Sequence, residues 1–144
     1  MKRILFYFLS LNIAACSSAD DNVPQTNLEC EAVSEVLEDA AFNAIQEVNY
    51  TFIDIQLNVN CLEVSIGASG CDTESWGMNL YSTDSFFTVF PLQRQVKFEL
   101  INGQACLAYF EETISFDLTP FQIEGQNEVP LQIEGWDEAL LYVY

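Results

Sequence analysis

The segment from Thr51 to Ile66 reads TFIDIQLNVNCLEVSI, and its alternation of apolar and polar residues decides the fold class. A period of two is typical of β-strands that bury one face. The polar residues Asn58–Asn60 separate two such runs and predict a hairpin turn. The faces predicted to be buried carry Thr51, Ile53, Ile55, Leu57 and Val59 in the first strand and Leu62, Val64 and Ile66 in the second.

The regions on either side of this hairpin differ in their period. Gly67–Gly70 is an expected loop directly after it. Cys30–Val48, before it, follows the i, i+3, i+4 pattern of an amphipathic helix and lacks Gly and Pro. Further strands are predicted at Ser75–Tyr81, Phe86–Phe90, Gln95–Ile101, Cys106–Leu118, Phe121–Gly125, Leu131–Trp136 and Leu140–Tyr144.

Together these elements predict a mostly β fold over residues 30–144. Short strands separated by turn signals indicate an antiparallel β-sandwich, Ig-like or a related Greek key, here with one short N-terminal helix. The length suits a single domain.

An internal repeat lies near the C-terminus. Pro120–Gln126 reads PFQIEGQ, and Pro130–Trp136 reads PLQIEGW. We interpret the two copies as neighbouring strands that obey the same inside–outside rule, with the leading proline at a strand start or edge. The alternative is a short binding ribbon of Gln and Glu side chains.

The composition excludes several functions. The 144 residues include 22 acidic residues, 4 basic residues and no histidine, for a formal charge of −18. Phosphate binding needs Lys and Arg, so we expect no nucleic-acid partner. Without histidine there is no Ser-His-Asp or Cys-His catalysis and no His-ligated metal. Half of the residues are hydrophobic, which excludes a disordered acidic tail.

The N-terminus has the layout of an export signal. Met1–Arg3 is basic, Ile4–Ile13 is mostly apolar, and two alanines precede Cys16. The apolar run is shorter than the about 20 residues that span a bilayer. Ile13-Ala14-Ala15-Cys16 resembles the bacterial lipobox. This resemblance implies that residues 1–15 are a signal peptide and that Cys16 receives acyl chains such as palmitate.

The resemblance also implies an address. Residues 16–29 would form a lipidated, flexible linker, with the membrane as a partner through the anchor. In lipoproteins of this kind, a serine rather than an aspartate directly after the lipidated cysteine favours transport to the outer membrane. Ser17 at this position therefore implies the outer membrane of a Gram-negative bacterium. Ser17–Asn22 is similar to the Ser/Asp-rich signal that exports Bacteroidetes lipoproteins to the cell surface, although a solvated acidic linker explains it equally well. Loss of the cations Lys2 and Arg3 with the signal peptide takes the formal charge to −20.

The remainder of the chain broadly resembles small, uncharacterised Bacteroidetes surface lipoproteins, and this resemblance implies no activity. The residues that carry it are Gly67-Ala68-Ser69-Gly70-Cys71, Ser75-Trp76, Gln93-Arg94, Phe116-Asp117-Leu118 and Leu140-Leu141-Tyr142-Val143-Tyr144.

Four cysteines follow Cys16, an even number that predicts two disulfides in an exported chain. Three pairings are possible. Cys61 and Cys71 lie near opposite ends of a predicted strand, so a bond between them is disfavoured. The strand directions place Cys71 and Cys106 at one end of the sandwich. They place Cys30 and Cys61 at the other end if the predicted helix and Thr51–Leu57 run in opposite directions, so we expect Cys30–Cys61 and Cys71–Cys106. A thiolate metal site is disfavoured, because no C-x-x-C pair is present.

Charged residues give no catalytic motif. Neighbouring carboxylates on a strand point to opposite faces, so Glu111 and Glu112 are not expected to share a proton as an acid/base pair would. We therefore expect no enzyme, and a small carboxylate-based hydrolase is the alternative.

We expect no cofactor, and a weak calcium site at Asp72-Thr73-Glu74 is the one alternative. Arg94 and Lys97 are three residues apart and should face opposite sides of a strand. The adjacent carboxylates are Asp20-Asp21, Glu38-Asp39, Glu111-Glu112 and Asp137-Glu138.

The aromatic residues leave the ligand open, because most aromatic side chains in a sandwich fill the core. Trp76 and Trp136 are the candidates for an exposed ligand platform. The expected function is a membrane-anchored, non-catalytic binding or structural β domain at the cell surface, with a glycan or a protein as its ligand. A carbohydrate-binding or substrate-capture module is an alternative, and a protease inhibitor fits the same residues.

Overall fold

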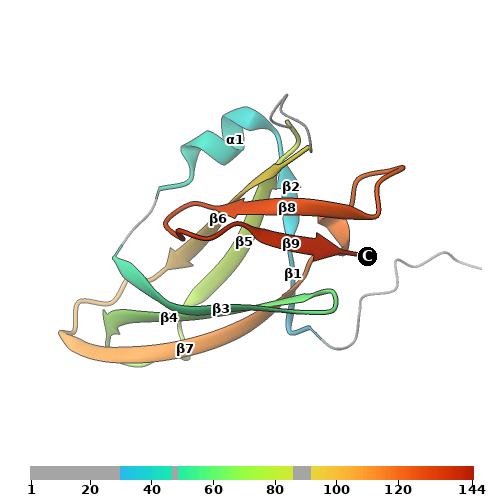
Figure 1. The fold of residues 1–144 in the computed structure, drawn as a ribbon. Helices are drawn as coiled ribbons and strands as arrows, with labels where there is room; N and C mark the ends of the chain where they lie inside the picture. Colours follow the sequence, from blue (N-terminus) through green and yellow to red (C-terminus); the bar gives the residue numbers. More distant parts are fainter. Residues whose placement is uncertain (1–29, 47–48, 86–91) are drawn as a thin grey trace, which may run out of the picture.

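The computed structural model describes residues 30–46, 49–85 and 92–144, and their strands form two sheets that face each other (Figure 1). The mostly β prediction is confirmed, and the described residues contain one short α-helix, α1 (Asp39–Ala44). In spatial order, the first sheet holds β1 (Ala32–Val33), β7 (Ala108–Asp117), β4 (Cys61–Gly70) and β3 (Tyr50–Asn58). The second sheet holds β2 (Glu35–Leu37), β5 (Gly77–Thr83), β6 (Arg94–Ile101), β8 (Glu128–Ile133) and β9 (Leu140–Val143).

The sheets are mixed, which corrects the expectation of a wholly antiparallel sandwich. β1 pairs with β7, β2 with β5, and β6 with β8 in parallel, while the other neighbours are antiparallel. The parallel pairs arise where the chain changes sheets. At the first change, Ser34 is buried between β1 and β2, and both its backbone N–H and its hydroxyl donate to the carbonyl oxygen of Asp117.

The helix predicted over Cys30–Val48 is wrong in extent. The segment forms β1, β2 and only six residues of helix. Phe42, which lies off the predicted apolar stripe, is the buried residue of α1. Hydrogen bonding to the edges of β7 and β5 therefore outweighs the local helical period, because edge strands leave backbone groups to be paired.

The hairpin predicted at Asn58–Asn60 is confirmed, with Asn58 paired to Cys61. Val59 at its tip has φ 55° and is 70% exposed, so its assignment to the buried face is wrong, because the residue belongs to the turn. The Gly67–Gly70 loop prediction is wrong, because β4 continues to Gly70 and pairs there with Ala108. These glycine and small residues continue the strand because β7 supplies a full set of backbone partners.

The register of β3 shifts between Phe52 and Asp54, and this bulge changes which face is buried. Beyond it, Ile55 is buried and Leu57 is half-buried, as predicted. Before it, Thr51 and Ile53 are exposed, while Tyr50 and Phe52 pack against the core. The inward assignment of Thr51 and Ile53 is therefore wrong, since one extra residue reverses the alternation.

The later strands agree with their predicted positions except at Phe121–Gly125. That segment holds the end of a 3-10 helix, η1 (Thr119–Phe121), and a turn. The two repeat copies are therefore not neighbouring strands. The strand predicted at Phe86–Phe90 lies outside the described residues.

The core fills the space between the two sheets. β4 contributes alternate residues from one side, and β6 and β8 contribute from the other. The core includes Leu62, Val64, Ile66, Leu80, Val96, Phe98, Phe116, Leu118, Phe121, Val129, Leu131, Ile133 and Tyr142.

Disulfides join Cys30 to Cys61 and Cys71 to Cys106, the pairs that the strand directions favoured. Cys61 is the first residue of β4, and Cys71 follows its last residue. At about 3.3 Å per residue, the two bonds are roughly 30 Å apart along this strand. They therefore fasten opposite ends of the first sheet.

Candidate functional site

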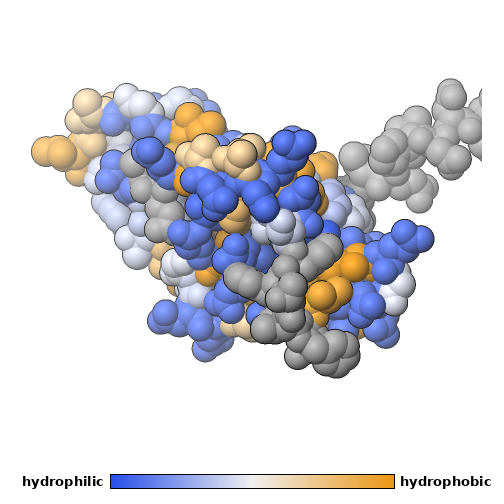
Figure 2. Space-filling view, turned by 90° about the horizontal axis from the view of Figure 1, so that it is seen from above, coloured by the Kyte–Doolittle hydropathy of each residue, from blue (hydrophilic) through white to orange (hydrophobic). Residues whose placement is uncertain are grey.

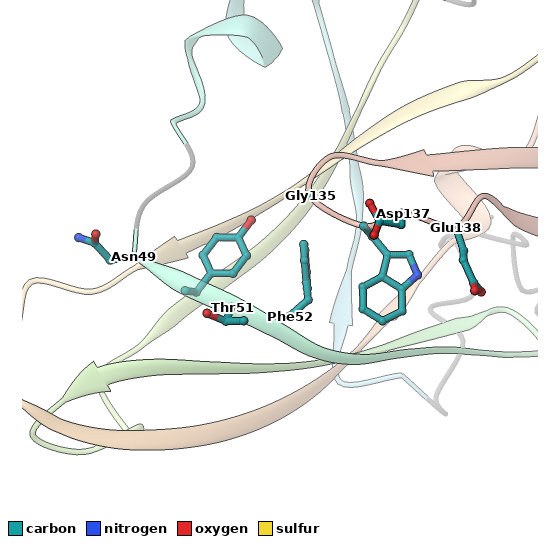
Figure 3. Close-up of a pocket in the computed structure, with 8 residues that line it drawn as sticks. Asn49, Thr51, Phe52, Gly135, Asp137 and Glu138 are labelled. Atoms are coloured by element: carbon teal, nitrogen blue, oxygen red, sulfur yellow. The ribbon is translucent and has the colours of Figure 1, made fainter.

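A hollow of about 600 Å³ lies where the beginning of β3 meets the turn between β8 and β9 (Figure 3). We call it the aromatic pocket. Its volume is within the range of small-molecule binding sites. It is lined by Asn49, Tyr50, Thr51, Phe52, Gly135, Trp136, Asp137 and Glu138.

Three aromatic side chains form the wall of the pocket. The ring of Phe52 lies 5.1 Å from that of Tyr50 and 6.0 Å from that of Trp136, centre to centre, with both pairs edge to face. Phe98 of the core lies 5.1 Å from Tyr50 and 5.9 Å from Phe52. The hydroxyl of Tyr50 also donates to the carbonyl oxygen of Phe98 at 3.0 Å. The wall is thus anchored in the core.

The bulge in β3 creates this wall. With strict alternation from Ile55, residues 51 and 53 would point inward, whereas the register shift turns Tyr50 and Phe52 toward the second sheet. The sequence analysis missed both residues. The signal was present in consecutive Phe52 and Ile53, since two adjacent apolar residues interrupt a period of two.

A tight turn places Trp136 opposite these rings. Gly135 has φ 82°, which favours glycine, and the backbone N–H of Trp136 donates to the carbonyl oxygen of Ile133. The N–H of Glu134 donates to Val96 on β6, so the turn is fixed to the second sheet. Trp136 therefore lines a pocket, as the platform prediction requires.

The rim of the pocket is polar and carries two carboxylates. Asn49, Thr51, Asp137 and Glu138 are all exposed. In the described part of the chain, neither Asp137 nor Glu138 makes a hydrogen bond or an ion pair through its side chain. Both carboxylates are thus available to a ligand.

The platform prediction is wrong for Trp76. This side chain is 8% exposed and belongs to the core. It lies beside Gly70, where an added Cβ would stand 3.1 Å from the indole Nε1. A buried indole cannot stack on a ligand, so of the two tryptophans Trp136 is the candidate.

Asp72, suggested for calcium, makes hydrogen bonds within the loop beside the Cys71–Cys106 disulfide. Its carboxylate accepts hydrogen bonds from Gln104 at 3.1 Å and from the hydroxyl of Ser75 at 3.1 Å. The bond from Gln104 lowers the pKa of Asp72 from its ordinary value. Within residues 30–46, 49–85 and 92–144, no three or more His, Cys, Asp or Glu side chains are grouped to hold a metal.

A second hollow of about 950 Å³ adjoins the aromatic pocket and shares residues 49–51 with it. It extends to the β6–β7 connection, where Leu107 is 93% exposed. Tyr109 lies across Gly67, where a side chain would collide with its ring. Figure 2 shows a mostly hydrophilic surface with separate apolar patches, one at the end of the molecule where this connection lies.

Arg94 and Lys97 face opposite sides of β6, as predicted. Arg94 is 5% exposed and donates to the carbonyl oxygens of Phe121 and Thr83. Burial lowers the pKa of its guanidinium. Lys97 lies on the outer side, where its ammonium is 3.3 Å from Glu134 and 5.1 Å from the centre of the Phe42 ring. Neither cation offers an open anion site.

The remaining sequence predictions concern the carboxylate pair on β7 and the lipidation site. Glu111 is exposed and Glu112 half-buried on β7. Cys16 lies outside the described residues. Among the described residues, no helix combines the length and the apolar character needed to cross a membrane.

Comparisons with known proteins give a fold but no family. No protein-family model matches the chain, and no curated protein matches its sequence. A NigD-like immunity protein from Bacteroides caccae ATCC 43185 has a TM-score of 0.56 at 9% identity, covering 78% of this chain and 64% of that one. A protein of unknown function, DUF1344, from Bacteroides vulgatus ATCC 8482 has a TM-score of 0.51 at 14% identity, covering 78% and 56%.

These likenesses show the fold alone at such low identity. The chain spans less than two thirds of the length of either neighbour. Both come from Bacteroides species, in agreement with the resemblance to small Bacteroidetes proteins.

Proposed function

We propose that this chain is an exported, lipid-anchored, non-catalytic binding domain, and that the aromatic pocket is its ligand site. The observation that carries the proposal is a wall of three aromatic side chains beside rim carboxylates that have no side-chain partner in the part of the chain that the structure describes. Binding sites typically combine apolar walls with a few convergent polar groups in this way.

The anchoring part rests on Ile13-Ala14-Ala15-Cys16 and the basic start at Lys2 and Arg3. Two or more acyl chains on Cys16 would hold the protein stably at a membrane. Mass spectrometry of membrane fractions should find an acylated N-terminal Cys16, and protease treatment of intact cells should release the domain. Cys16→Ser should move the protein to the soluble fraction. An unacylated wild-type protein in the soluble fraction would refute the anchoring.

The non-catalytic part rests on exposure at the pocket. Asp137 and Glu138 are the carboxylates that line it, and both are exposed. Catalytic carboxylic acids are commonly desolvated so that they keep their proton. Hydrolysis of glycoside substrates that is lost in both Asp137→Asn and Glu138→Gln would favour the hydrolase alternative instead.

A carbohydrate is a second candidate ligand, because Trp136 lines the pocket and aromatic rings stack on sugars. A glycan array with the wild type, Trp136→Ala and Trp76→Phe would test it. Sugar binding at the pocket predicts loss of signal in the Trp136 variant only.

A further inference from the structure

We propose that the aromatic pocket recognises an organic cation, namely a primary ammonium group on an aliphatic chain, as in a free amine or a lysine side chain. This inference rests on the proposed function and names the ligand class of the same site. Three observations support it: the aromatic wall, the rim carboxylates without a cationic partner among the described residues, and the contact of Lys97 with a ring and a carboxylate elsewhere in the molecule.

The wall supplies aromatic rings, whose faces attract cations. Aromatic rings bind ammonium groups within about 6 Å of their centres, most strongly when the ring is an indole. Trp136 and Tyr50 stand on either side of Phe52 along the wall. An aliphatic stem can pack on the same rings, because the pocket is long enough to be lined from residue 49 to residue 52.

The rim supplies the counter-charge. Asp137 and Glu138 follow Trp136 directly and have no cationic partner in the part of the chain that the structure describes. The two cations of residues 30–144 are already engaged, Arg94 in the interior and Lys97 with Glu134. An anionic ligand would meet repulsion here, whereas a cation gains attraction from both carboxylates.

The molecule already contains one such complex. The ammonium of Lys97 lies between the ring of Phe42 and the carboxylate of Glu134, and donates to the carbonyl oxygen of Ile45. The aromatic pocket offers the same two kinds of group, a ring and a carboxylate, without the ammonium. A ligand would complete this arrangement at the pocket.

The two tryptophans make a direct test possible. The 15N-labelled protein, purified with both disulfides intact in a polyoxyethylene detergent, should show two indole N–H signals, which Trp136→Phe and Trp76→Phe assign. Nα-acetyl-lysine methylamide should shift the Trp136 signal in a saturable way and leave the buried Trp76 signal in place. The neutral norleucine isostere should shift neither.

Matched charge variants separate local from general electrostatics. Asp137→Asn with Glu138→Gln should weaken binding of the lysine derivative at least fivefold. Glu124→Gln with Glu128→Gln removes two exposed charges at the far end of the β8–β9 hairpin and should change it less than twofold. Unchanged Trp76 signals establish that each variant is folded.

The outcomes decide between the ligand class and the site. Equal binding of the lysine and norleucine derivatives, or equal loss in both charge variants, overturns the cation proposal. Saturable binding of maltotriose at Trp136 without binding of the lysine derivative also overturns it, but leaves the proposed function standing. Putrescine that binds tighter than the lysine derivative supports a free amine as the source, and the reverse order supports a peptide.

Discussion

The two copies of the internal repeat have nearly the same sequence and different structures. In the second copy, Leu131–Ile133 pairs with Arg94–Val96 as part of β8. In the first copy, Phe121 ends the 3-10 helix η1 and pairs with no strand among the described residues. Its carbonyl oxygen instead accepts a hydrogen bond from the Arg94 side chain.

The ends of the copies are nevertheless alike. Both contain Ile-Glu-Gly followed by one residue, and in both the N–H of that last residue donates to the carbonyl oxygen of the isoleucine. Gly125 has φ 79° and Gly135 has φ 82°. The difference teaches that the turn is encoded locally, whereas strand formation depends on a free neighbouring edge.

The largest effect should come from the matched core positions. Phe121 and Leu131 are both 0% exposed, although one is in a 3-10 helix and the other in a strand. Phe121→Ala and Leu131→Ala should each lower the free energy of unfolding by about 3–4 kcal/mol, through lost burial and cavity formation. Urea denaturation measures both. A loss below 1 kcal/mol for Phe121→Ala alone would mean that the first copy is not part of the same core.

Substitution of Arg94 tests whether its hydrogen bond to Phe121 stabilises the first copy of the repeat. Its side chain donates to Phe121 and Thr83 in the interior, and Met would keep much of the aliphatic volume. Arg94→Met should lower stability by about 2–3 kcal/mol, because the carbonyl oxygen of Phe121 loses the Arg94 donor and that of Thr83 is left with the Ser82 hydroxyl. Arg94→Lys is the control that keeps the charge. Hydrogen exchange should rise more at residues 121–123 than at residues 131–133, and the opposite order would contradict this explanation.

The two glycines test the local part of the comparison. Gly125→Ala and Gly135→Ala place a side chain in the left-handed region and should each lower the unfolding free energy by about 1 kcal/mol. Nothing lies near an added Cβ at Gly125, so strain alone acts there. Effects that differ by more than about 1 kcal/mol between the two sites would show that the turns are not equivalent.

The smallest effect should come from the last residue of the first copy. Gln126 is exposed, whereas Trp136 at the matching position packs on Phe52. Gln126→Trp should change stability by less than about 0.5 kcal/mol, as for other surface substitutions. Trp136→Gln, the reverse exchange, should be clearly destabilising. Thermal unfolding followed by circular dichroism compares the two variants.

The difference between locally encoded turns and strands that depend on a neighbouring edge also explains which sequence predictions succeed. The hairpin at Asn58–Asn60 follows from local alternation, and the Cys71–Cys106 pair follows from the strand directions. The Cys30–Cys61 pair is also correct, although its prediction relied in part on the helix over Cys30–Val48. The helix over Cys30–Val48 fails because β7 and β5 offer edges to this segment, which no local pattern reveals. Gly67–Gly70 forms a strand for the same reason.

The candidate site shows most clearly that local sequence and distant partners determine different features. Trp136 could be proposed from its residue type, but its burial and that of Trp76 depend on distant partners. Tyr50 and Phe52 were missed because a single bulge reverses the face of β3. The pocket therefore needs two elements from different sheets, β3 and the β8–β9 turn, and no single stretch of sequence contains both.

The Cys30–Cys61 bond also has a mechanical consequence. A pulling force that enters from the N-terminal side of the domain reaches Cys30 before it reaches β1. The disulfide transmits the load directly to the start of β4, which is held between β7 and β3. The short strands β1 and β2 are bypassed, so they are not peeled from their sheets one bond at a time. The load then enters at β4, a ten-residue strand that is paired on both sides, and a reducing agent should lower the rupture force by exposing β1 and β2 to the load.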